Sequence, residues 1–158
     1  RSRLRGNERA GLLASSNAAR LKPHGVFIKA KIEPAKWFLA PSKDVRSSNA
    51  LEDAASEFEV QGLELDWACV CWDANFLWNG ETWETRQFRG TRWQSVNDKH
   101  RQRYIANSYR VLLTRARQGM VIFVPKGSLT DSTRDPEAYD TIYDFLCRAG
   151  FEPIPMEK

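Results

Sequence analysis

The chain has 158 residues and a mass of 18.2 kDa, a length that suits one domain around one hydrophobic core and is short for two. It is 42% hydrophobic and 28% charged, and no apolar run approaches the roughly 20 residues of a membrane-spanning helix, so a disordered chain and a membrane partner are excluded. The net charge of +4 and the pI near 9.1 are mild for the whole chain.

Cysteine usage and the first residues indicate a cytoplasmic protein. Cys69 and Cys71 alternate within an apolar run, and Cys147 lies in a predicted helix. An odd number of cysteines cannot all pair in disulfides. No second cysteine pair and no nearby histidine completes a metal site with Cys69 and Cys71, so we expect buried thiols. The start has no apolar stretch for a signal peptide and no Met, as in a fragment of a longer chain.

The first third of the chain predicts short elements. Ala10–Ala14 is apolar and precedes Ser and Asn residues, which predicts a buried strand leading into a capped helix over residues 17–21. A short strand is expected near residues 26–28. Residues 51–58 form a moderately apolar run that ends near a Gln-Gly turn, which favours a strand entering a functional loop.

The middle of the chain carries stronger signals. Residues 67–72 (WACVCW) are continuously apolar, which is typical of a parallel strand that is buried on both faces. Asn79-Gly80 lies between two apolar pieces and predicts a hairpin within a small antiparallel insertion over about residues 74–97. Apolar residues then recur at three- and four-residue spacing, which predicts an amphipathic helix over residues 99–117 with Gly119 as its C-cap.

The last elements complete the fold prediction. Residues 120–124 (MVIFV) predict a second apolar strand, and Asp135-Pro136 predicts the capped start of a helix to about Arg148 that ends at Gly150. Apolar strands that alternate with helices indicate an α/β domain with a mainly parallel sheet. Ligands of such sheets bind beyond the carboxyl ends of strands, so we expect them at the loops after Ala14, near Gln61 and after Val124.

Two segments resemble helicase motifs. Residues 56–66 (SEFEVQGLELD) and 109–124 (YRVLLTRARQGMVIFV) are similar to motifs five and six of superfamily-one helicases, in the same order. The closer resemblance is to the Schlafen-like DNA/RNA helicase group, whose bacterial members were long a family of unknown function. There, EF-x-x-QGLE-x-D and YRVLLTR occur in this order, with a Trp-rich insertion between them.

This resemblance implies an architecture and partners. Residues 1–158 would be a single C-terminal RecA-like domain of the P-loop NTPase type, with helices flanking the sheet. ATP and Mg²⁺ would bind together with an N-terminal RecA-like domain of the same parent chain, and the pair would act on single-stranded nucleic acid. The sequence has no G-x-x-x-x-G-K-[ST] loop, since Lys126-Gly127-Ser128 lacks the preceding glycines, so we expect no ATP hydrolysis by this chain alone.

Arg115 is the candidate catalytic residue. Transfer of a phosphoryl group loads charge on its oxygens, and an arginine from a facing domain can stabilise that charge. Arg115 matches the motif-six arginine of the family, whereas Arg117 would point elsewhere on a helix. The alternative is that arginines at a helix C-terminus only favour the helix dipole.

Four residues are candidates for nucleotide binding. Gly62 lets backbone approach a ligand closely, and Gln61 and Glu64 can bond sugar hydroxyls or phosphate-bound water. The resemblance makes Glu64 the ribose contact. The segment GLLASSNAARL resembles motif four with Ser15 in place of an arginine, so either Arg20 substitutes for that arginine or the site depends on Arg115 alone.

Candidates for nucleic-acid contact fall in three places. Ser56, with Glu57, matches positions of backbone contacts in the family, and Arg110 lies off the face of Arg115. From residue 86 to residue 103 six bases face one acid, which suits a polyanion as well as a solvated face. There, Trp83 would stack bases while Arg89 and Arg92 hold phosphates, or the tryptophans would pack on the domain instead.

Two functions from different classes remain open. The first is the C-terminal half of an ATP-dependent DNA/RNA helicase or translocase that supplies an arginine finger and nucleic-acid contacts. The second is a nucleic-acid-binding or scaffolding module with a RecA-like fold that does not hydrolyse ATP. Ser15 keeps the second open because serine carries no charge to a phosphate.

Overall fold

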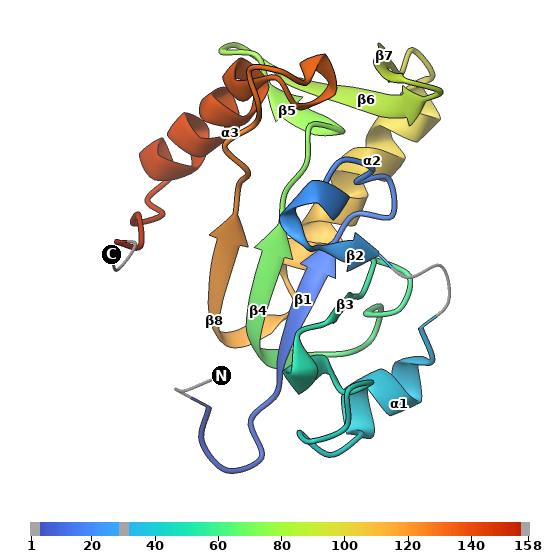
Figure 1. Ribbon diagram of the computed structural model, residues 1–158, viewed down its shortest axis with the longest axis vertical. Helices are drawn as coiled ribbons and strands as arrows, with labels where there is room; N and C mark the ends of the chain where they lie inside the picture. Colours follow the sequence, from blue (N-terminus) through green and yellow to red (C-terminus); the bar gives the residue numbers. More distant parts are fainter. Residues whose placement is uncertain (1–3, 29–31, 156–158) are drawn as a thin grey trace.

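The structure of the protein is a computed structural model that describes residues 4–28 and 32–155. Its centre is a parallel sheet of β1 (Ala10–Ala14), β4 (Leu65–Cys71) and β8 (Ala116–Phe123), in the order β1-β4-β8. A second parallel pair, β2 (Phe27–Ile28) and β3 (Asp53–Ala54), joins it through a bridge between Leu13 and Ala55. The strands therefore run in parallel in the order β2-β3-β1-β4-β8 (Figure 1).

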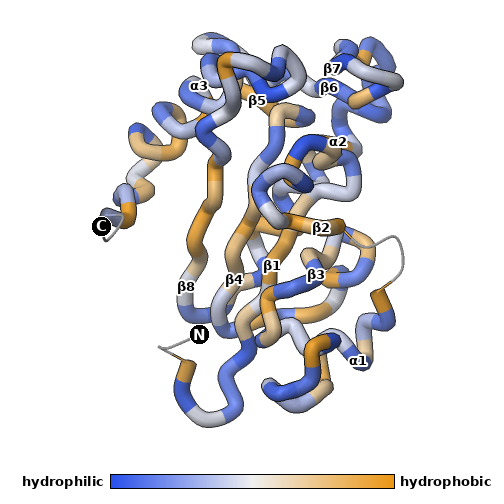
Figure 2. Tube along the Cα trace, in the orientation of Figure 1, coloured by the Kyte–Doolittle hydropathy of each residue, from blue (hydrophilic) through white to orange (hydrophobic). Residues whose placement is uncertain are grey.

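Both faces of the sheet are covered in its centre. On one face Leu13, Ala68 and Val70 pack against Trp37 of α1 (Pro34–Leu39) and Leu112 of α2 (Lys99–Leu113). The segment that follows β1 covers part of the other face. The apolar cluster there consists of Ala14, Ala18, Leu21, Val26, Ala54 and Cys71. Figure 2 shows the apolar strands crossing the middle of the molecule. Burial on two sides explains the continuous apolar run of residues 68–72, whereas Trp67 at its start is exposed.

The insertion stands above the carboxyl ends of the strands (Figure 1). It consists of β5 (Phe76–Trp78), β6 (Trp83–Arg89) and β7 (Arg92–Ser95), which pair antiparallel in that order. Gly80 has a φ of 102° in the turn between β5 and β6, so the predicted hairpin is confirmed. Helix α3 (Pro136–Arg148) lies beside it, capped by the side chain of Asp135 and followed by Gly150 in the left-handed region, as predicted.

The predicted helix over residues 17–21 is wrong. The segment is irregular and only a 3-10 turn, Lys22–His24, follows it. Two of its backbone amides bind side-chain acceptors instead of helical carbonyls: Asn17 N donates to Ser15 Oγ, and Arg20 N donates to Asp73 Oδ2 at 2.8 Å. Such bonds compete with helix formation. The strand expected over residues 51–58 is also limited to Asp53–Ala54.

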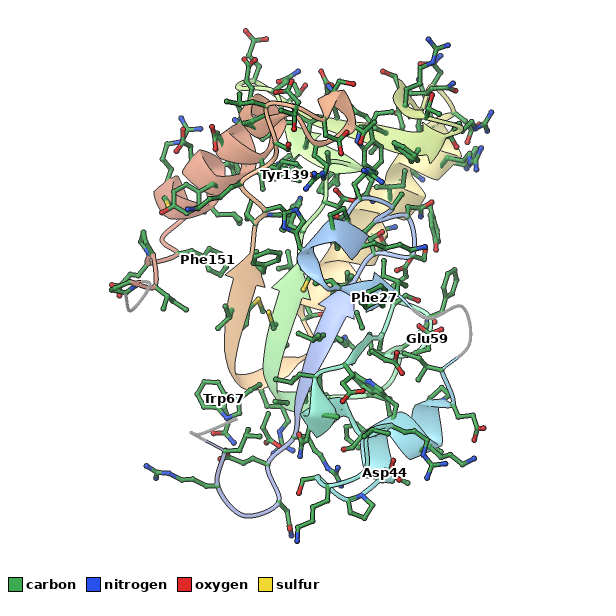
Figure 3. All side chains as sticks on the ribbon, in the orientation of Figure 1. Phe27, Asp44, Glu59, Trp67, Tyr139 and Phe151 are labelled. Carbon is green, nitrogen blue, oxygen red and sulfur yellow. The ribbon has the colours of Figure 1, made fainter. Side chains whose placement is uncertain are left out.

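Helix α2 ends at Leu113, four residues earlier than predicted. Side chains satisfy part of its last turn. Thr114 Oγ1 lies within donating distance of the carbonyls of Arg110 and Val111, and Arg115 Nε donates to that of Val111. Gly119 is not a helix cap but lies inside β8, where a Cβ would overlap the ring of Trp67 on the neighbouring strand (Figure 3). Arg117 consequently lies on a strand rather than on a helix.

A buried carboxylate closes the carboxyl edge of the sheet. Asp73, two residues after the end of β4, is fully buried and accepts hydrogen bonds from the amides of Arg20 and Ala74, each at 2.8 Å, and from Tyr139 Oη at 2.7 Å. Figure 3 shows Tyr139 between α3 and the strands. Three donors compensate in part for the loss of water around the charge, yet burial still raises the pKa of Asp73.

The part of the chain that the structure describes has free cysteines, no membrane-spanning helix and no metal-binding cluster. No helix there is long and apolar enough to cross a membrane, and no group of three or more His, Cys, Asp or Glu residues there could hold a metal ion. Cys71 is buried, Cys69 and Cys147 are partly buried, and all three are free thiols.

The two strand glycines predict a contrast in stability. An alanine Cβ at Gly11 would lie 2.7 Å and 2.8 Å from ring carbons of Trp37, which is 2% exposed and has no room to move. Gly11→Ala should therefore lower the free energy of unfolding by about 1–3 kcal/mol. Gly119→Ala should cost less, because the ring of Trp67 is 37% exposed and can turn toward solvent. Urea denaturation of both variants measures this, and equal losses would contradict it.

The raised pKa of Asp73 predicts a pH dependence. The folded state binds a proton on the Asp73 carboxyl more readily than the unfolded state does. Above the raised pKa the charged carboxylate therefore lowers the free energy of unfolding. This destabilisation disappears as the pH falls toward the ordinary pKa of 3.8. The free energy of unfolding of the wild type minus that of Asp73→Asn should therefore increase from neutral pH to about pH 4. Carboxyls such as Asp44, whose pKa Arg46 lowers to about 2, act in the opposite direction but cancel in this difference. A difference that stays constant or decreases would refute the assignment.

Candidate functional site

Arg115 joins the two motif segments. It follows Thr114 directly before β8 and is partly buried. Its guanidinium donates from Nε to the carbonyl of Val111 and from Nη2 to Thr114 Oγ1, each at 3.0 Å, and from Nη1 to the carbonyl of Leu63 at 3.3 Å. Its own carbonyl accepts from the amide of Leu65 at 2.8 Å. The side chain of the motif-six candidate therefore lies against the Gln-Gly turn.

The nucleotide candidates next to Arg115 face solvent. Gln61, Gly62 and Glu64 are all exposed. Gly62 has a φ of 83°, and nothing lies within 4 Å of the place where its Cβ would be. These three residues precede β4 as Arg115 precedes β8, so the group lies at the amino edge of the sheet. The turn near Gln61 is thus on the opposite edge from the loops after Ala14 and Val124.

The chemistry of this amino-edge group suits part of a nucleotide. A guanidinium has five N–H donors, and the three bonds of Arg115 leave two of them for an anion. The carboxylate of Glu64 and the amide of Gln61 can bond sugar hydroxyls. The described residues offer no glycine-rich loop that could enclose a triphosphate and no carboxylate cluster for its magnesium ion.

Arg20 lies apart from this group. Its Nη2 forms an ion pair with Asp131 at 2.9 Å, and its guanidinium lies 5.5 Å from the centre of the Phe88 ring. Its amide binds Asp73 beyond the carboxyl end of β4, whose seven residues span about 20 Å. Arg20 and Arg115 are therefore too far apart to contact one phosphate. Ser15, at the position of the motif-four arginine, is fully buried and accepts from Asn75 Nδ2.

Ser56 and Glu57 use their polar groups inside the protein. Ser56 is 3% exposed, and its hydroxyl donates to Glu59 Oε2 at 2.6 Å. Glu57 accepts hydrogen bonds from the hydroxyls of Ser16 and Tyr104, each at 2.7 Å. Burial, followed by this bond to Glu57, raises the pKa of Tyr104 to about 12. These contacts hold the loop after β3 to the loop after β1 and to α2.

Trp83 packs on the domain, as the alternative interpretation expected. Its ring is stacked with Phe76 at 4.5 Å between centroids and meets Phe145 edge-on at 4.8 Å. Arg89 and Arg92 are exposed at the turn between β6 and β7. Arg110 is exposed on α2 and bonds Asn107 at 3.0 Å. The structure thus distributes the nucleic-acid candidates over the insertion, α2 and the loop after β3.

Sequence reasoning missed the partners that position Arg115. Thr114 precedes it in the Leu-Thr-Arg segment and binds its Nη2, so this neighbour carried a signal. The carbonyl of Leu63 carried none, because every residue has a carbonyl and only the fold brings this one to Arg115.

The fold is thus a parallel α/β sheet in which Arg115 joins the two motif segments at the amino edge. The family described as Schlafen group 3, DNA/RNA helicase domain, matches residues 1–126. This match covers more than half of the 158 residues, and the chain belongs to that family. Comparison with curated proteins gives no match, and comparison with solved structures gives none either.

Proposed function

We propose that the chain is the C-terminal RecA-like half of an ATP-driven DNA/RNA helicase or translocase. ATP and Mg²⁺ would bind in the cleft between this domain and an N-terminal RecA-like domain of the same parent chain. Arg115 would contact the γ-phosphate, and Gln61, Gly62 and Glu64 would contact the sugar and phosphates. Membership of a DNA/RNA helicase domain family supports the helicase class of this proposal.

The observation that carries the proposal is the position of Arg115. Its guanidinium reaches the carbonyl of Leu63 at 3.3 Å, so it shares one edge of the sheet with the exposed Gln-Gly turn and Glu64. A charge fixed by three hydrogen bonds is already oriented before ATP arrives, which is how a preorganised donor stabilises a transition state. Arg20, held by Asp131 at the other edge, would stabilise the fold rather than bind nucleotide.

Closure of the two domains would couple ATP to nucleic acid. A triphosphate held by the N-terminal domain would draw Arg115 toward it, and the basic surface of this domain would move relative to its partner. Because this chain has no phosphate-binding loop of its own, hydrolysis would require both domains.

The test is an ATPase assay of the parent protein, with and without single-stranded nucleic acid. Arg115→Ala should lower kcat by at least about 100-fold with a smaller change in KM, because the arginine acts mainly on the transition state. Arg117→Ala is the matched control, since Arg117 is exposed two residues further on, and it should keep most of the activity.

Thermal denaturation of each variant separates loss of chemistry from loss of fold. Turnover that is unchanged in a folded Arg115→Ala variant would reject the role of Arg115. A parent protein that binds single strands without any ATP turnover would instead support the non-hydrolysing nucleic-acid-binding or scaffolding module, an outcome consistent with the buried Ser15.

A further inference from the structure

A large cleft lies between α2, the insertion and the end of α3. Its volume is about 1050 Å³, and it is widely open to solvent. One wall is a face of α2, the second is formed by β6 and the residues that follow β7, and the third is the last turn of α3 with Phe151. The amino-edge group around Arg115 is not part of this lining, apart from Thr114 at its end.

The wall formed by α2 carries a row of cations. Lys99, Arg103 and Arg110 all line the cleft and are exposed. Their spacings of four and seven residues place them on one helical face, over a length of about 16 Å. None of the three has an ion pair among the residues that the structure describes. These charges are therefore available to a ligand.

The acidic side of the cleft is already neutralised. Within the described part of the chain, Glu84 is the one acid that lines it. Its carboxylate binds Arg86 at 3.1 Å and Asn79 at 2.8 Å, and these contacts lower its pKa. The cleft thus presents a net positive rim, which favours an anionic occupant.

Aromatic rings form the floor. Phe76, Trp83 and Phe145 are partly exposed there, and Phe151 is 41% exposed at the rim. Phe76 packs on Trp72 and Tyr109, and Trp83 packs on Trp72. The two supporting rings, Trp72 and Tyr109, are buried and lie 4.4 Å apart between centroids. A floor backed by packed rings is rigid, and partly exposed aromatic surface of this kind can pack against bases of any sequence.

We propose that this cleft binds single-stranded nucleic acid, with Lys99, Arg103 and Arg110 on the phosphates and bases stacked on the ring floor. The inference deepens the proposed function and rests on its nucleic-acid part, but it needs neither ATP nor Arg115. A single strand is favoured over a duplex because its bases are free to stack. It is favoured over an acidic peptide because the floor is aromatic as well as apolar.

The experiment measures binding of the chain to a fluorescent 20-nucleotide oligothymidylate by anisotropy. Lys99→Gln/Arg103→Gln/Arg110→Gln should weaken binding at least about tenfold and reduce the slope of log K against log salt by about 2, as expected for three lost phosphate contacts on a single strand. The matched control is Lys22→Gln/Lys43→Gln/Lys126→Gln, which removes the same charge from exposed positions outside the cleft. It should bind almost as the wild type does. Equal loss in both triple variants would overturn the proposal.

The ring floor is tested separately. An abasic strand of the same length, which keeps the phosphates and lacks the bases, should bind at least about fivefold more weakly than oligothymidylate. Phe145→Leu should lower affinity for oligothymidylate by a similar factor and affinity for the abasic strand little. Thermal denaturation checks that this variant is folded, and if it is not, the abasic strand decides alone. Base stacking in the cleft would be overturned if oligothymidylate bound no more tightly than the abasic strand, a 20-base-pair duplex or a polyglutamate peptide.

The two proposals fail in different ways. If Arg115→Ala leaves turnover of the parent protein unchanged but binding depends on the α2 cations, the proposed ATP site is rejected and the cleft proposal stands. Normal dependence on Arg115 with no effect of the α2 cations would reject the cleft alone.

Discussion

The burial of one carboxylate organises the upper half of this molecule. Asp73 lies just beyond the central strand and is fully buried, so its charge must be met by donors from the chain. Those donors come from three separate elements: the segment after β1, the backbone just beyond β4, and Tyr139 of α3. Meeting this requirement fixes the loop after β1 as irregular chain and holds α3 beside the insertion.

The two edges of the sheet carry different chemistry. At the amino edge the backbone is exposed and one guanidinium crosses from the start of β8 to the turn before β4. At the carboxyl edge, where parallel sheets usually bind ligands, the space is filled by buried polar side chains such as Ser15 and Asn75. A ligand of the carboxyl edge would have to displace that network. A ligand of the amino edge would meet an arginine and an exposed turn.

Membership of the Schlafen group 3 DNA/RNA helicase domain family gives the amino-edge group a context. The family match ends at residue 126, so α3, which forms one wall of the aromatic cleft, lies beyond it. The cleft therefore combines matched and unmatched parts of the chain. Trp83 packs on Phe76 and Phe145 and also lines this open cleft.

The sequence alone determined the elements whose signals are local. The apolar runs became β1, β4 and β8, Asn79-Gly80 formed the hairpin turn, and Asp135-Pro136 began α3, because burial on two faces, a positive φ and a cap each depend on a few adjacent residues. Only the tertiary structure decided that residues 17–21 are not helical, that Gly119 lies in a strand and that Arg20 is separated from Arg115. Each of these depends on a partner distant in sequence: the carboxylate of Asp73, the ring of Trp67 and the ion pair with Asp131. A local pattern contains no information about such partners, since it is the folding of the whole chain that brings them into contact.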